Sequence, residues 1–163
     1  MDMAIIRYAA KKDVPELVSM VKGLLLMHIC RFRSFSRSEM VHNLDEVLGK
    51  DYLKVGLPKK NVLVAEAEGE IVGFCEFEVS LSSIVFKKRR YLYLHDLFIK
   101  QGYRKRGIGR MLMQRLAEIA KERKCAHSRI ELDVDAGNKE ALAFYNKFGF
   151  KPGKRVRLIR QVK

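Results

Sequence analysis

The sequence predicts one α/β domain, in which strands and helices alternate along the chain. Three observations support this prediction. Apolar residues recur at helical spacing in several segments, alternating or continuous apolar runs lie between those segments, and no Pro-rich linker or internal repeat divides the chain. Because 48% of its 163 residues are hydrophobic, the chain can form a continuous core, and we expect residues 1–163 to be a single domain.

The N-terminal part is expected to form a short strand followed by two helices. Residues 4–8 read as the strand. Asp13, with Glu16 three residues later, resembles a capping box at the start of the first helix, and Ser36 with Glu39 repeats that pattern for the second. The residues that follow the first cap at helical spacing are Val14, Leu17, Val18, Val21, Leu25 and His28.

The middle of the chain is expected to supply the centre of a sheet. "NVLVAEAEGEIVGFCEFEVS" (residues 61–80) contains two extended runs joined by an acidic turn with a glycine, which predicts a hairpin. "YLYLHDLFI" (residues 91–99) is apolar on both faces, as expected of a central strand. Only His95 and Asp96 interrupt it, which makes this polar pair a candidate for function.

The C-terminal part continues the alternation. A helix is expected from Gly107 onward, a strand at residues 128–134, a helix at residues 138–147 that Gly149 ends, and a last strand in the basic segment 154–161. The apolar positions that define the first of these helices are Ile108, Met111, Leu112, Leu116, Ile119 and Ala120.

Composition narrows the functional classes. Thirty-three basic residues against nineteen acidic ones give a formal charge of +14, which favours polyanionic partners such as nucleic acid, a membrane surface or a phosphorylated cofactor. The three cysteines are odd in number and widely spaced, so we expect buried thiols in a reducing, cytoplasmic compartment. The longest apolar run, residues 23–30, is too short to span a bilayer, and no histidine spacing suggests a metal site.

The segment "QGYRKRGIGR" (residues 101–110) joins the central strand to the next helix. It combines clustered cations with glycines, and a helix N-terminus beside such a loop aims main-chain N–H groups at an anion. Two familiar phosphate motifs do not fit. A Walker loop needs Lys-Ser/Thr where Ile108 and Gly109 stand, and the dinucleotide fingerprint needs a glycine at Leu112.

The pattern Gln/Arg-x-x-Gly-x-Gly/Ala does fit, as Arg104-Lys105-Arg106-Gly107-Ile108-Gly109. "LYLHDLFI" precedes it and "NKEALAFYNKFGF" (residues 138–150) follows. In this order the three segments resemble the GNAT superfamily of N-acetyltransferases over residues 60–152. They are most similar to its diamine and polyamine branch, where the strand commonly reads Glu-Asp in place of His95-Asp96. The resemblance implies a mixed, mostly antiparallel central sheet flanked by helices.

The resemblance also implies roles for individual residues. The loop amides would cradle the pyrophosphate of acetyl-CoA, with Arg104 shaping the loop, and Tyr145 would protonate the departing thiolate of coenzyme A. The implied cofactor-binding residues are the backbones of Leu97, Phe98 and Ile99 along the pantetheine arm, the loop residues Arg104, Lys105, Arg106, Gly107, Ile108, Gly109 and Arg110, and Asn138. Solvated cations, core packing and a plain helix cap are the alternative readings of these residues.

The implied reaction is direct transfer, in which a neutral amine attacks the thioester carbonyl without an acyl-enzyme. An alkylamine of pKa ~10.4 is mostly protonated at neutral pH, and deprotonating it costs about 4 to 5 kcal/mol. His95 and Asp96 are the candidate proton acceptors, directly or through water. In a regular strand only one of these neighbours faces a given side, unless a bulge intervenes.

We therefore expect an acetyl-CoA-dependent N-acetyltransferase whose acceptor is the primary amine of a small molecule. A protein N-terminus or lysine is the alternative acceptor. From other classes, a basic nucleic-acid-binding module, suggested by "KKRRY" (residues 87–91), and a non-catalytic acetyl-CoA sensor stay open. The expected partners are acetyl-CoA or CoA and an amine acceptor, with no membrane and no metal, and a homodimer is left open.

Overall fold

A computed structural model of the chain describes residues 4–27, 61–81, 90–125 and 129–153. It forms two compact units, Met1–Asp133 and Val134–Lys163, and each is described by itself. The single domain expected for residues 1–163 thus stays a prediction. The helix expected from Ser36, the strand expected at 154–161 and three of the four histidines lie outside the described residues.

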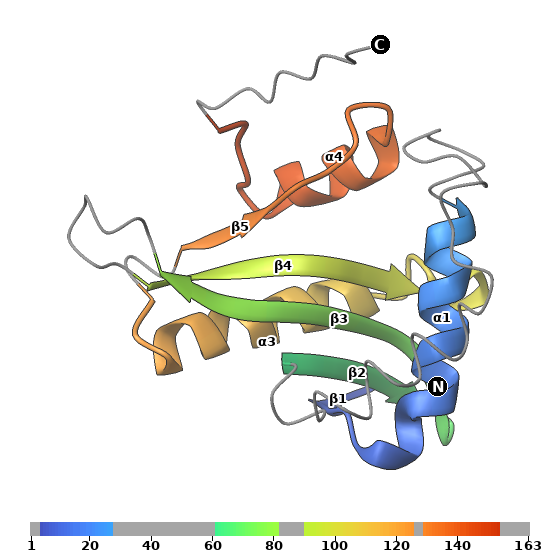
Figure 1. The fold of residues 1–163 in the computed structure, drawn as a ribbon. Coiled ribbons are helices and arrows are strands. Elements are labelled where there is room, and N and C mark those ends of the chain that lie inside the picture. The colour runs from blue at the N-terminus through green and yellow to red at the C-terminus, as the bar shows by residue number, and fades with distance from the viewer. Residues whose placement is uncertain (1–3, 28–60, 82–89, 126–128, 154–163) are drawn as a thin grey trace, which may run out of the picture. The chain divides into compact units, whose positions relative to one another are not determined.

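The first unit contains a five-stranded sheet in which each strand pairs with its neighbours in the sequence (Figure 1). All pairs are antiparallel except that of the last two strands, which is parallel. The strands are β1 (Ile5–Tyr8), β2 (Asn61–Ala67), β3 (Glu70–Leu81), β4 (Arg90–Ile99) and β5 (Ile130–Leu132). The prediction of a mixed, mostly antiparallel sheet is confirmed, although β5 is shorter than the strand expected at 128–134.

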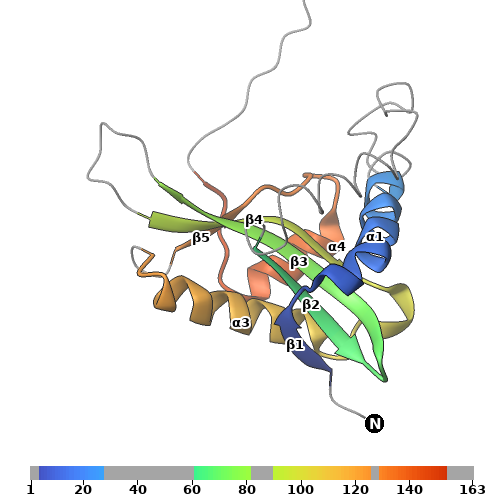
Figure 2. The same ribbon diagram turned by 60° about the horizontal axis from the view of Figure 1, so that its bottom comes forward.

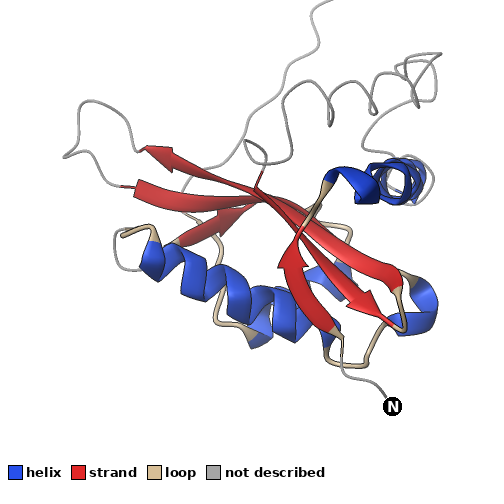
Figure 3. Cartoon of the chain, turned by 90° about the horizontal axis from the view of Figure 1, so that it is seen from below, coloured by secondary structure: helices blue, strands red, loops and turns tan. Residues whose placement is uncertain are grey.

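Two helices cover opposite faces of this sheet, α1 (Val14–Met27) and α3 (Ile108–Glu122) (Figures 2 and 3). Burial confirms most of the predicted positions, but Leu24 rather than Leu25 and Met113 rather than Met111 are fully buried, and His28 lies outside the described residues. Under α1 the core consists of Val14, Leu17, Val18, Met20, Val21, Leu24, Val62, Val64, Ile71 and Phe74, with Phe98 packed against it. The buried residues of α3 are Ile108, Gly109, Leu112, Met113, Leu116, Ile119 and Ala120.

The predicted hairpin at 61–80 is confirmed as β2 and β3. Its turn consists of Glu68 (φ 54°) and Gly69 (φ 79°). Positive φ at both central residues is typical of a two-residue hairpin turn, whose twist matches that of the flanking strands. The turn places Ala67 opposite Glu70 and Glu66 opposite Ile71, and a bulge at Val72 then brings Val64 opposite Phe74.

The start of α1 differs from the capping box expected at Asp13 and Glu16. Asp13 ends a short 3₁₀ turn and its buried carboxylate accepts hydrogen bonds from the Ala10 amide (2.7 Å) and from both terminal nitrogens of Arg7 (2.7 and 3.0 Å). Glu16 instead pairs with Lys100, at 2.8 Å. Spacing alone could not reveal these partners, since both come from outside the helix.

The second unit contains helix α4 (Lys139–Lys147), as predicted. The Asn138 side chain caps its start by accepting a hydrogen bond from the Ala141 amide at 3.1 Å. At its end, Gly149 has φ 81°, and the amides of Gly149 and Phe150 donate to the carbonyls of Asn146 and Tyr145. This is a Schellman motif, so the prediction that Gly149 ends the helix is confirmed.

Candidate active site

Strand β4 contains a bulge at the polar pair that interrupts its apolar sequence. Asp96 lies opposite Glu76 of β3, whereas Leu94 lies opposite Phe77, so His95 is the extra residue. A bulge of this kind lets two consecutive side chains point to the same side of a sheet. His95 and Asp96 can therefore both face a substrate on the same side of the sheet, which a regular strand would not allow.

The register defines which side chains share this face. Residues directly opposite on neighbouring strands point to the same side, and Val62, which packs under α1, lies opposite Glu76. Glu76 in turn lies opposite Asp96. We call the polar part of this side the β3–β4 polar face; its members are Glu76, Glu78, Tyr93, His95 and Asp96. The opposite side carries the buried residues Leu92 and Leu94.

His95 contacts both strands of the polar face. Its Nε2 lies 3.5 Å from Oε2 of Glu78, and its ring meets that of Tyr93 edge to face with the centroids 4.9 Å apart. The His95 side chain is 40% exposed, so the imidazole can exchange a proton with a molecule that binds on this face. Sequence reasoning missed Glu78 and Tyr93, although the alternation of Glu76 and Glu78 in the hairpin was a usable signal.

The end of β4 is open on one side. β5 pairs only with Leu92 to Leu94, and no strand within the described residues pairs with Asp96 to Ile99 on that side. The Phe98 carbonyl faces β3, close to Gly73, and main-chain groups alternate along a strand. Leu97 and Ile99 therefore turn their main-chain groups to the open edge, where an amide-containing chain could pair with them.

The loop after β4 supplies donors next to that edge. Lys105 and Gly107 both have left-handed backbone conformations, with φ 61° and 86°, and α3 begins directly after Gly107. In the described part of the chain the amides from Lys105 to Arg110 donate to no main-chain carbonyl, since the first helical bond comes from Met111. Such a loop at a helix N-terminus is suited to bind phosphate oxygens.

Two cations of the loop also have structural contacts. Arg104 donates from Nε to the Ile99 carbonyl at 3.1 Å and so connects the loop to the end of β4, in keeping with the shaping role expected of it. The guanidinium carbon of Arg106 lies 5.1 Å from the centroid of the Tyr103 ring. Lys105, Arg106 and Arg110 are exposed, so they can approach an anion in solution.

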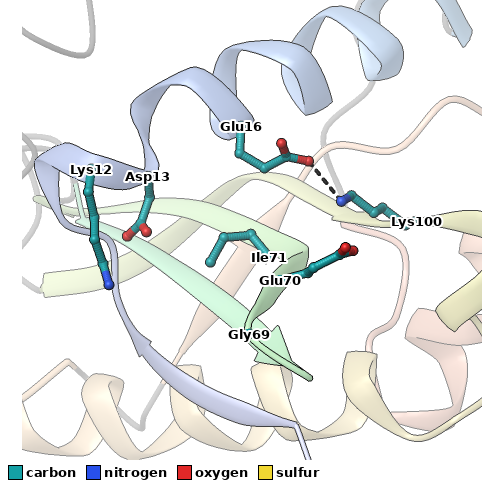
Figure 4. Close-up of a pocket in the computed structure, with 7 residues that line it drawn as sticks. All are labelled: Lys12, Asp13, Glu16, Gly69, Glu70, Ile71 and Lys100. Carbon is teal, nitrogen blue, oxygen red and sulfur yellow. Dashed lines mark ion pairs between the residues drawn. The ribbon is translucent and has the colours of Figure 1, made fainter.

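A separate hollow of about 340 Å³ lies between the start of α1, the β2–β3 turn and Lys100 (Figure 4). Its lining is mainly charged, and the ion pair of Glu16 with Lys100 crosses one side of it. This pair connects α1 to the residue between β4 and the loop. The residues that line the hollow do not include the loop residues 105–110, whose amides are available to an anion. We therefore assign the hollow a structural role rather than a role in the reaction.

The remaining two predicted site residues belong to the second unit. Asn138 and Tyr145 lie at the start and in the last turns of α4. The half-buried Tyr145 ring packs against Phe144 and Phe150, with centroid distances of 5.3 and 5.5 Å. The Asn138 side-chain oxygen serves the helix cap, which leaves its amide nitrogen for another partner.

Comparison with known proteins indicates a family in which this arrangement, a strand with an open end followed by a loop suited to bind phosphate, is expected. The model of the acetyltransferase (GNAT) family matches residues 27–150. This chain belongs to the GNAT family. The family predicted from the three sequence segments is therefore confirmed. The matched residues include most of each of the two units.

Relatives of this GNAT chain carry acetyltransferase names. An uncharacterized N-acetyltransferase of Archaeoglobus fulgidus is 37% identical over 59% of this chain and 65% of its own length, and a thialysine N-epsilon-acetyltransferase of Bos taurus is 35% identical over 56% of each. This chain thus spans less than two thirds of either relative. A solved aminoglycoside N-acetyltransferase in complex with CoA has the same fold, with a TM-score of 0.72 and 16% identity over 97% of this chain and 94% of that one.

Within the described residues, no helix has the length and apolarity needed to cross a membrane. The same part of the chain contains no group of three or more His, Cys, Asp or Glu side chains arranged to hold a metal ion.

Proposed function

We propose that this GNAT protein is an acetyl-CoA-dependent N-acetyltransferase that acts on the primary amine of a small, cationic molecule. The observation that carries the proposal is the continuous run from the open edge of β4 into the loop of unbonded amides. Acetyl-CoA supplies the acetyl group as a thioester. Leu97 and the Ile99 N–H offer main-chain groups for its amide-containing arm, whereas the Phe98 carbonyl is turned to β3 and the Ile99 carbonyl already accepts from Arg104. Residues 105–110 offer N–H groups and cations for its diphosphate.

The polar face next to this edge suits an amine. Glu76 and Asp96 lie directly opposite each other on the side of the sheet that also carries His95. An ammonium group bound on this side would be attracted by both carboxylates and held close to His95. The carboxylates thus provide a local negative site on a chain whose formal charge is +14, which supports a cationic acceptor over an anionic one.

Different residues accept and supply the protons of the proposed reaction. His95 accepts the proton that the bound ammonium must lose, since an imidazole titrates near neutral pH. Asp96 orients the amine. We assign to Tyr145 the proton that the departing thiolate needs, and to Asn138 a contact with the donor. The nitrogen–carbon bond forms as the carbon–sulfur bond breaks. From ammonium to amide the nitrogen loses two protons, the first to His95 before the attack and the second after it, while Tyr145 supplies one to the thiolate, so each turnover releases one proton net to solvent.

An acceptor screen tests this proposal. Purified protein is mixed with acetyl-CoA and a panel of diamines, amino acids, aminoglycosides and lysine-containing peptides, and free thiol is followed with a chromogenic disulfide. We expect thiol release with small cationic amines. Release with peptides alone would move the acceptor to protein amines, and calorimetry that detects no binding of CoA or acetyl-CoA would refute the proposal.

A series of binding measurements at increasing salt separates the proposed enzyme from a nucleic-acid-binding module. A nucleic-acid-binding module would bind duplex DNA with an affinity that falls steeply with salt. We expect CoA binding to outlast DNA binding as salt is raised, because amides as well as cations hold the diphosphate. Binding without turnover of any amine would instead identify an acetyl-CoA sensor.

A further inference from the structure

The proposed reaction assigns no role to Glu78 of β3, although this residue contacts His95. Its Oε2 faces Nε2 of His95 at 3.5 Å, while its Oε1 accepts a hydrogen bond from the Ser80 hydroxyl at 2.5 Å. The carboxylate is thus fixed at one oxygen and directed at the imidazole with the other. The hydrogen bond from Ser80 and, to a smaller extent, the neighbouring His95 lower the pKa of Glu78, so this group stays ionised at neutral pH.

The other side of the imidazole is also in contact. The Tyr93 ring meets the His95 ring edge to face, and the Tyr93 hydroxyl donates to Asp133 just after β5, at 2.9 Å. The Tyr93 ring is therefore held at its hydroxyl by the residue that follows β5. Together, Glu78 and Tyr93 limit the rotation of the His95 ring.

A neutral imidazole carries one proton, on either Nδ1 or Nε2. A carboxylate that faces Nε2 attracts an N–H there and repels a lone pair. We propose that Glu78 is a positioning residue that keeps the proton of neutral His95 on Nε2, so that Nδ1 is the atom that accepts the proton of the amine. This inference rests on the proposed function and assigns the proton acceptor of that reaction to a single atom.

The proton step balances as follows. The N–H bond of the bound ammonium breaks and its electron pair stays on nitrogen as the lone pair that the amine needs. The proton bonds to Nδ1 of His95. The resulting imidazolium faces the ionised Glu78 through Nε2–H, and this attraction favours the protonated state that the step produces.

Other ionisable groups lie on the same face as His95, and the experiment has to separate their effects from that of Glu78. Within the described residues these are Glu76 on β3 and Tyr93 and Asp96 on β4, and Asp133 is linked to them through the Tyr93 hydroxyl. Glu78→Gln changes only one charge and keeps the shape. Ser80→Ala keeps the charge and removes its anchor. Glu118→Gln is the matched control, because it removes a paired surface carboxylate on α3, which covers the other face.

Nitrogen-15 NMR of the imidazoles reads the tautomer directly, without any need for activity. His95→Ala identifies the His95 signals among those of the four histidines. In the wild type and in Glu118→Gln we expect protonated Nε2 and bare Nδ1 above the titration midpoint. Glu78→Gln should give a mixture of both tautomers. A protonated Nδ1 in the wild type, or an unchanged tautomer in Glu78→Gln, would overturn the proposal.

Turnover gives a second readout. In Glu78→Gln kcat should fall by roughly 2- to 10-fold with the KM for acetyl-CoA unchanged, because only part of the protein then carries a bare Nδ1, and Ser80→Ala should give a smaller decrease. If neither variant lowers kcat, Glu78 has no such role. Wild-type protein that acetylates no amine refutes the proposed function, whereas the NMR result alone decides the tautomer.

Discussion

Replacement of Gly107 by alanine tests the loop on which the proposed cofactor site depends. Gly107 has φ 86°, and a Cβ added there meets no atom within 4 Å, so the effect of the change is purely conformational. A residue other than glycine in the left-handed region costs about 1 to 2 kcal/mol. If the loop keeps its conformation, this cost lowers the free energy of unfolding. If the free loop relaxes, the cost instead weakens CoA binding by a factor of about 5 to 30.

The loss of stability and the loss of CoA affinity both come from the strain at position 107, so the two losses should add up to about 1 to 2 kcal/mol. Urea unfolding measures the loss of stability, and titration calorimetry with CoA measures the loss of affinity. Gly102→Ala is the matched control, since it lies in the same loop region, has an ordinary φ and also has an open Cβ position. Equal behaviour of the two variants, or a Gly107→Ala protein that matches the wild type in both measurements, would refute the reasoning.

The remaining predictions concern three other positions. Tyr145→Phe keeps the ring packing against Phe144 and Phe150, so we expect a folded protein with unchanged CoA affinity and turnover about 100-fold lower; unchanged turnover would remove Tyr145 from its role. In Gly73→Ala the new Cβ would lie 2.8 Å from the Phe98 carbonyl oxygen, so calorimetric unfolding should show a loss of about 1 to 3 kcal/mol together with weaker CoA binding. Asp13→Asn should cost about 2 to 3 kcal/mol at pH 7, because the Arg7 guanidinium lowers the pKa of Asp13. That depressed pKa stabilises the wild type above the unfolded value of ~3.9, so the difference should shrink in urea unfolding below pH 4 and would contradict this account if it did not.

The order of strands and helices was predictable from local patterns. Period-two and helical spacing mark β2, β3, α3 and α4, and Gly149 ends α4 as its left-handed conformation requires. The loop at 104–109 was recognisable for a similar reason, since its conformation depends on glycine and on its place between a strand and a helix.

What the sequence could not reveal depends on contacts between distant residues. The partners of Asp13 and Glu16 come from β1 and from the end of β4. The bulge at His95 is a property of the β3–β4 register rather than of β4 alone, and sequence alternation does not report it. For the same reason the sequence does not reveal that Glu78, seventeen residues away in the chain, faces His95.

His95 has no counterpart across the ladder and contacts β3 through the Glu78 side chain instead. Leu94 and Asp96, on either side of it, carry the pairing of β4 with β3. The group that handles the substrate proton can therefore be exchanged without rebuilding the platform for the acetyl donor. For protein engineering, the proton acceptor can be varied at position 95 while the strand end and loop proposed to hold the acetyl donor stay the same.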